Sequence, residues 1–243
     1  MFNEEDYLDE DGFLDDAIIF HDTLNPAIWE IDGEMKSEVR NALMAMASEF
    51  QDFLGLDNLD VRDIVITGSN AAFTYTPHSD IDLHLVVRIP ARFDELYLEL
   101  FDAKKNLYNL THDQKIKGFD VEFYVEDERE QAVSMGIFSI LKNRWIHTPR
   151  KVKASIDDAS VKAKVAAFQD QIAACLESND LDLAKKTWEN LKAMRKAGLD
   201  SGGEFSPENL AFKILRTQGL NKKLFDHIVS IKDKELSLES RTK

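Results

Sequence analysis

The sequence predicts an α/β (α+β) fold, in which a mixed sheet is flanked by helices and followed by a helical C-terminal subdomain. Short runs of β-branched or alternating polar and apolar residues lie between residues 63 and 125, as expected for strands. Apolar residues at steps of three and four precede and separate these runs, as expected for amphipathic helices. Beyond about residue 150 only the helical spacing continues.

Two strands are predicted around a glycine turn. The first covers residues 63–67 and ends at Gly68, where glycine permits unusual backbone angles and close approach of a ligand. Ser69 follows and offers a hydroxyl and nearby backbone amides to a phosphate. The second strand covers residues 80–87, and its alternation separates two faces. The polar face carries Asp80, Asp82 and His84, and the apolar face carries Ile81, Leu83 and Leu85.

Two carboxylates on one face of a strand indicate a metal site. Like charges held this close repel and raise one another's pKa unless a cation lies between them. Carboxylate oxygens of this kind suit magnesium or manganese. His84 on the same face is either a substrate contact or a hydrogen-bonding residue behind the metal ligands.

A third acidic position is expected if the site performs two-metal nucleotidyl transfer. The run 119–125 alternates in the same way, with Asp120, Glu122 and Tyr124 on its polar face. Glu122 is favoured because it lies in the middle of the strand. Asp120 points the same way, so the sequence leaves both open.

Helices are predicted over residues 35–54 and 91–110, beside these strands. A strand or hairpin over 136–149 ends this part of the chain, and its Trp145 is either a stacking platform for a base or a buried structural residue. Ser206 and Pro207 have the chemistry of a helix start, as N-cap and first helical residue. The predicted divisions are an acidic arm over 1–34, a core over 35–150 and a helical subdomain over 151–243.

The pattern of Gly68-Ser69, a spacer, Asp80-Ile81-Asp82 and a later acidic strand resembles the polymerase-beta-type nucleotidyltransferase superfamily. Segments of the chain are also similar to small predicted nucleotidyltransferases of tailed bacteriophages. These segments are Thr-Gly-Ser at 67–69, Tyr-Thr at 75–76, Ser-Asp-Ile-Asp-Leu-His at 79–84 and Val-Glu-Phe-Tyr-Val at 121–125.

The resemblance implies a nucleotidyltransferase core that binds a nucleoside triphosphate, for instance ATP, with two Mg²⁺ or Mn²⁺ ions. It implies that Asp80, Asp82 and Glu122 hold the ions and that Gly68 and Ser69 hold the nucleotide phosphates. Ser79, directly before the first aspartate, is a further nucleotide-binding candidate. The chain departs from many members after Gly-Ser, where it has Asn-Ala-Ala-Phe-Thr-Tyr over residues 70–75 in place of an arginine-glycine pair.

The expected activity is transfer of a nucleoside monophosphate to a hydroxyl with release of pyrophosphate. The acceptor stays open between an RNA end, a protein hydroxyl and a small molecule. The net charge of −15 and the lack of a long basic strip argue against processive polymerisation on a long nucleic acid. The alternative is a catalytically inactive nucleotide-sensing or protein-binding module on the same fold.

The charge, cysteine content and hydrophobicity of the chain limit the cellular compartment in which we expect it. The first 60 residues hold 17 acidic side chains against 2 basic ones, whereas residues 141–243 carry a net charge of +6. The single cysteine, Cys175, excludes an intramolecular disulfide and fits a reducing compartment. No apolar run is long enough to span a bilayer, and the acidic N-terminus is unlike a secretory signal. These features predict a cytoplasmic protein without a membrane partner, whose exposed helices could support a homodimer.

Overall fold

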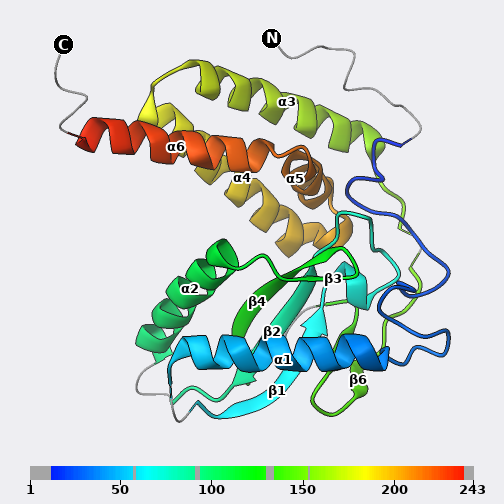
Figure 1. The fold of residues 1–243 in the computed structure, drawn as a ribbon. Helices are drawn as coiled ribbons and strands as arrows, with labels where there is room; N and C mark the ends of the chain where they lie inside the picture. Colours follow the sequence, from blue (N-terminus) through cyan, green and yellow to red (C-terminus); the bar gives the residue numbers. More distant parts are fainter. Residues whose placement is uncertain (1–11, 57–58, 91–93, 130–133, 153, 238–243) are drawn as a thin grey trace. The chain divides into compact units, whose positions relative to one another are not determined.

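The computed structural model describes residues 12–56, 59–90, 94–129, 134–152 and 154–237 (Figure 1). The first eleven residues of the predicted acidic arm and residues 91–93 of the second predicted helix lie outside these ranges. The chain divides into two compact units. The sheet unit comprises residues 19–153, and the helical unit comprises residues up to 18 together with residues 154–243.

The sheet unit contains six strands and two α-helices within the described ranges. The helices are α1 (Ser37–Leu54) and α2 (Asp94–Thr111). The strands are β1 (Val61–Thr67), β2 (Ile81–Val87), β3 (Lys115–Ile116), β4 (Phe119–Asp127), β5 (Ile137–Ser139) and β6 (Arg144–His147). The sheet order is β3-β4-β2-β1-β5-β6. Because β2 and β4 pair in parallel and the other pairs are antiparallel, the sheet is mixed, as predicted.

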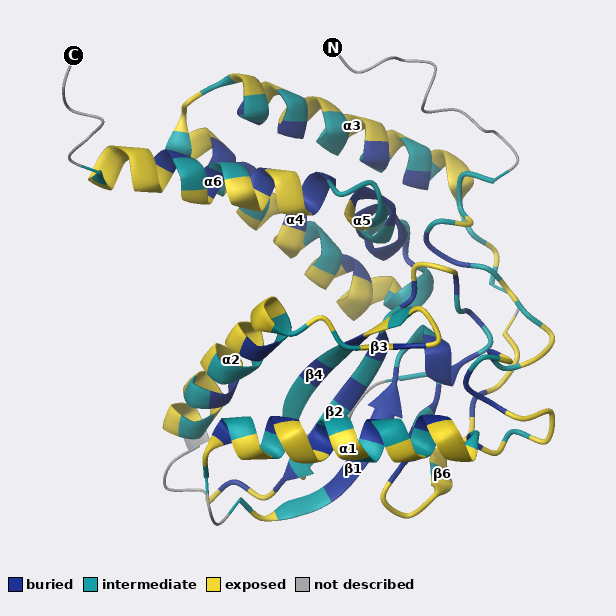
Figure 2. Ribbon diagram, viewed as in Figure 1, coloured by how far each residue is buried: buried dark blue, intermediate teal, exposed yellow. Residues whose placement is uncertain are grey.

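One face of the sheet is apolar and packs against α1 and α2. The inward residues of β2 alternate with half-buried ones, and Figure 2 shows the same alternation of buried and intermediate segments along the strands. In α1 the apolar residues recur at helical spacing, and Gly55 ends the helix in the left-handed conformation. Buried members of this core include Leu43, Phe50, Ile81, Leu83, Phe101, Tyr108 and Phe123. The opposite face carries polar side chains such as Asp82 and His84, together with Val65 and Val86.

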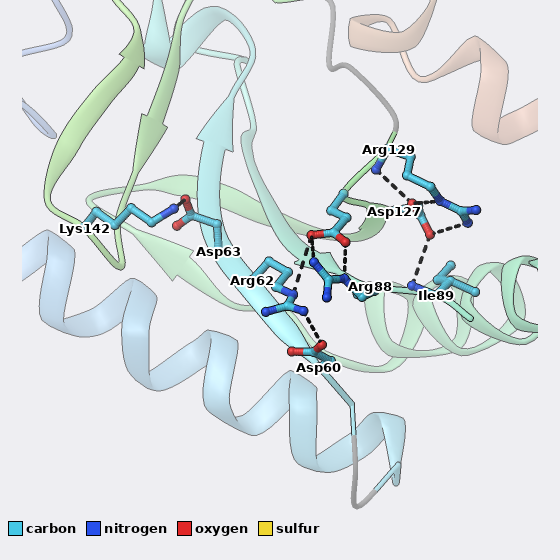
Figure 3. A network of polar contacts seen from close by, with 9 residues as sticks. Asp60, Arg62, Asp63, Arg88, Ile89, Asp127, Arg129 and Lys142 are labelled. Carbon is cyan, nitrogen blue, oxygen red and sulfur yellow. Dashed lines mark hydrogen bonds and ion pairs between the residues drawn. The ribbon is translucent and has the colours of Figure 1, made fainter. Parts of the chain in front are cut away.

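Ion pairs lie at the C-terminal ends of β2 and β4, called here the far strand ends, as Figure 3 shows. Asp127, at the end of β4, accepts hydrogen bonds from the guanidinium of Arg129 at 2.7 and 2.9 Å and from the backbone N–H of Ile89 at 3.2 Å. Beside it, Glu128 pairs with Arg88 and Arg62. These bonds hold the Arg129 guanidinium against Asp127 and keep the pKa of that carboxyl low, at about 2.

The helical unit has its own core. Its α-helices are α3 (Asp158–Glu177), α4 (Leu181–Gly202), α5 (Pro207–Thr217) and α6 (Leu220–Leu236). Ser206 caps α5 by accepting a hydrogen bond from the N–H of Asn209, with Pro207 in the first turn, so the predicted helix start is confirmed. Ala17 and Ile18 are buried in this core, and Oγ1 of Thr217 donates to the carbonyl of Asp16 at 3.2 Å. In the described part of the chain, no helix combines the length and apolar character required to cross a membrane.

Candidate functional site

The strand register brings two of the predicted acids together. In the parallel β2–β4 pair, Asp82 lies opposite Glu122. On the other side of β2, Asp82 lies opposite Thr67, the last residue of β1. Asp80 directly precedes β2, at the same end of the sheet. The polar faces of β2 and β4 therefore meet at one end of the sheet. There Asp80, Asp82 and Glu122 form what is called here the acidic edge.

The backbone of Gly68 lies very close to the carboxylate of Asp82. Its φ is +77°, and a Cβ built on it would lie 2.0 Å from Oδ2 of Asp82. A side chain at this position would therefore displace the carboxylate as well as strain the backbone. The turn continues into the 3₁₀ helix η2 (Ser69–Ala71), which places Ser69 directly after this contact.

The two candidate phosphate-binding serines lie within hydrogen-bond distance of each other. Oγ of Ser69 donates to Oγ of Ser79 at 2.7 Å, and Oγ of Ser79 accepts from the backbone N–H of Thr76 at 2.9 Å. Ser79 is buried. The structure thus gives Ser79 a role in fixing the loop before Asp80, and it places Ser69 at the joint between that loop and the Gly68 turn.

Asn70 is a site residue that the sequence reasoning missed. Its side chain is fully buried and donates to the carbonyls of Ser79 at 3.3 Å and Asp80 at 3.0 Å. It accepts from the amide of Asn25 at 2.7 Å, and the indole N–H of Trp29 donates to its backbone carbonyl at 2.8 Å. Asn70 therefore fixes the glycine turn to the backbone of Asp80. The only sequence signal was its place directly after Gly-Ser.

The two candidates for the third carboxylate have different surroundings. Asp120 pairs with the neighbouring strand's Lys115, and its side chain is 54% exposed. Glu122 faces Asp82 across the strand pair, and Oε2 of Glu122 accepts a hydrogen bond from the hydroxyl of Tyr124 at 2.5 Å. Position and partners both favour Glu122.

His84 lies on the same polar face, with one ring nitrogen hydrogen-bonded and the other beside a carboxylate. Its Nε2 is hydrogen-bonded to Oγ1 of Thr67 at 3.2 Å, and its Nδ1 lies 3.1 Å from Oε2 of Glu126. The side chains of His84 and Glu126 are only 18% and 13% exposed. The imidazole also stacks on the Tyr124 ring, with 4.8 Å between centroids. This geometry fits a hydrogen-bonding residue behind the acidic edge.

The pKa of the Tyr124 hydroxyl reflects the negative charge of the site. Burial raises the pKa of its hydroxyl well above the usual range, and the charges of Asp82, Glu122 and Asp80 raise it further. All three candidate carboxylates thus act on one partly buried hydroxyl. The phenol stays neutral and remains a hydrogen-bond donor among acceptors.

The carboxylates have the donor chemistry of a magnesium or manganese site, since both ions prefer oxygen ligands. The contact of Asp82 with Gly68 adds a tight cradle at one side. Within the described ranges, however, no three His, Cys, Asp or Glu side chains are grouped closely enough to hold an ion as they are placed. The residue types fit a divalent ion.

A cavity of about 540 Å³ in the sheet unit lies apart from these residues. Trp29, Trp145 and Phe73 line it, and none of the candidate site residues does. Trp145 stacks on the buried Trp29 with 4.6 Å between centroids, and its indole N–H donates to the carbonyl of Gly33 at 3.0 Å. Trp145 therefore has the contacts of a structural residue.

Comparison with known proteins bears on the sheet unit. Residues 46–147 match the family model described as a nucleotidyltransferase domain, and this segment contains every candidate site residue. The mixed sheet and its flanking helices are a nucleotidyltransferase-like fold. No curated protein matches the sequence.

Among solved structures, a STING-associated CdnE c-di-GMP synthase from Capnocytophaga granulosa is similar at 11% identity. The alignment covers 83% of this chain and 84% of that chain, with a TM-score of 0.24. At that score the alignment gives no information on the fold or activity of this chain.

Proposed function

We propose that the protein is a metal-dependent nucleotidyltransferase, which moves a nucleoside monophosphate from a nucleoside triphosphate to a hydroxyl acceptor. The observation that carries the proposal is the parallel register of Asp82 and Glu122 beside the Gly68 turn. The match of residues 46–147 to a nucleotidyltransferase domain supports it. In the reaction the acceptor oxygen bonds to the α-phosphorus, the bond to the pyrophosphate oxygen breaks, and the hydroxyl proton is released.

The candidate residues divide by chemistry. Asp80, Asp82 and Glu122 are the ligands for Mg²⁺ or Mn²⁺ ions. In two-ion sites, one ion lowers the pKa of the attacking hydroxyl and the other neutralises charge on the phosphates. Ser69 and the backbone beside Gly68 orient the triphosphate, and Asn70 keeps that turn in register with Asp80.

The test is label transfer from each of the four α-labelled ribonucleoside triphosphates with Mg²⁺, in the presence of separate RNA, protein and metabolite fractions. The labelled fraction identifies the acceptor class. We expect Asp82→Asn and Glu122→Gln each to lower the transfer rate by at least ~100-fold, because removing groups that only orient a metal ligand already costs 10–100-fold.

Asp120→Asn is the matched control. It removes a carboxylate from the same strand that is paired with Lys115 and largely exposed, so transfer should stay within about twofold of the unmodified protein. Loss of transfer in Asp120→Asn but not in Glu122→Gln would reassign the third carboxylate. Triphosphate binding that depends on Mg²⁺ without any transfer would favour the sensing module.

A further inference from the structure

A partly buried row of side chains runs along the polar face toward the acidic edge. It begins at Glu126 on β4, passes through His84 on β2, returns to Tyr124 on β4 and ends at Glu122. The strand register explains the row, since His84 lies opposite Tyr124 and Asp82 lies opposite Glu122. Glu126, Tyr124 and Glu122 follow one another at steps of two on β4, and His84 is paired with Tyr124, so all four share one face.

The Tyr124 ring has little freedom to move. The imidazole of His84 stacks on it with an interplanar angle of 21°, and the ammonium of Lys105, from α2, lies 5.4 Å from the ring centroid. The imidazole is itself hydrogen-bonded to Thr67 through Nε2, and its Nδ1 lies 3.1 Å from Oε2 of Glu126. The phenol hydroxyl is therefore presented to the acidic edge from a fixed position.

Glu122 is the side chain that the Tyr124 hydroxyl contacts. A glutamate has three rotatable bonds, and fixing its carboxylate costs conformational entropy. The 2.5 Å hydrogen bond from Tyr124 holds one of its two oxygens. A partner of this kind behind a metal ligand sets the orientation and basicity of that ligand.

We propose that Tyr124 is a positioning residue for the third carboxylate, and that its hydroxyl sets the affinity of the acidic edge for divalent ions by orienting Glu122. The proposal rests on the proposed function for the identity of the ligands. It assigns no contact between Tyr124 and the substrate.

The test measures Mn²⁺ binding to the full-length protein without nucleotide, from the electron paramagnetic resonance signal of free Mn²⁺. Tyr124→Phe keeps the stacked ring and removes only the hydroxyl. We expect its dissociation constant for Mn²⁺ to rise 10–100-fold. Tyr97→Phe, which removes a hydroxyl from a ring packed on the apolar core, should leave the constant unchanged.

A merely structural role for Tyr124 would lower the thermal midpoint of the variant but leave Mn²⁺ affinity intact in folded protein, so circular dichroism is recorded on the same samples. An unchanged Mn²⁺ constant in folded Tyr124→Phe overturns the proposal. If Tyr124→Phe does not fold, Glu126→Gln tests the row through His84, and unchanged affinity there overturns it too. Absence of Mn²⁺ binding by the unmodified protein would instead refute the metal site of the proposed function, and this proposal with it.

Discussion

Two glycines with positive φ show, at the scale of a single residue, the difference between a strained backbone and a steric contact. Gly68 and Gly118 both have positive φ, at +77° and +92°. A Cβ on Gly118 would meet no heavy atom within 4 Å, whereas a Cβ on Gly68 would meet the Asp82 carboxylate. Any difference between alanine variants at these positions therefore reports the contact with Asp82.

We expect Gly68→Ala to lower the transfer rate by at least ~100-fold, because Asp82 must leave its place. Gly118→Ala should cost about 1 kcal/mol of unfolding free energy from backbone strain and leave the rate near that of the unmodified protein. Rates and urea unfolding of both variants test this. Equal activity in the two variants would show that the contact with Asp82 has no functional weight.

The acidic residues could be predicted from sequence, but their pairing could not. Alternation places Asp82 and Glu122 on polar faces because side chains on a strand alternate. It does not give the register that puts them opposite each other, and so it could not separate Glu122 from Asp120. Asn70 was not predicted as a site residue for another reason. Its buried contacts reach Asn25 and Asp80, and a polar residue after Gly-Ser is also what an exposed turn contains.

At the scale of elements, an asparagine completes the edge of a strand. β3 pairs with β4 only through Lys115 and Ile116, so most of β4 has no strand on that side. Asn109 of α2 takes the missing place. Its side-chain amide donates to the carbonyl of Phe123 at 3.0 Å and accepts from the same residue's N–H at 2.9 Å.

Replacing Asn109 with leucine should cost about 1–3 kcal/mol of unfolding free energy, since two backbone groups at a partly buried edge lose their partners. Asn106→Leu on the exposed side of the same helix is the control and should change stability by less than about 0.5 kcal/mol. Chemical denaturation measures both. Equal losses would mean that helix propensity, and not the edge of β4, sets the effect.

Elements with long periodic patterns were predictable, and the shortest one was not. The helices α1 and α2, the helical character beyond residue 150 and the three longer strands follow from spacing, because burial on one face imposes a period. β3 has only two residues, too few for any alternation. The hairpin of β5 and β6 was expected as a strand or hairpin, and its antiparallel pairing resolves that alternative.

For the whole molecule, the ion pairs at the far strand ends make stability depend on pH. Arg129 holds the pKa of Asp127 at about 2, below the ordinary value of an unfolded aspartate. Because the folded-state pKa is the lower one, the stabilising contribution is complete above about pH 4. It is lost as pH falls from about 4 toward 2.

Asp127→Asn should therefore lower the unfolding free energy at neutral pH by about 1–2 kcal/mol, a value reduced for the half-exposed guanidinium of Arg129. The difference from the unmodified protein should shrink steadily below pH 4. Urea unfolding at a series of pH values measures it. A difference that stays constant across that range would remove Asp127 from the acid response.

The division into units also sets an order of synthesis. Residues 19–153 form one uninterrupted stretch, whereas the helical unit joins residues before 19 to residues after 153. A ribosome therefore synthesises every described strand of the sheet before any of α3 to α6. Ala17 and Ile18 emerge early, and the helices that bury them are made last. The sheet unit can fold during translation, whereas Ala17 and Ile18 can be buried only after the helices that pack on them have been made.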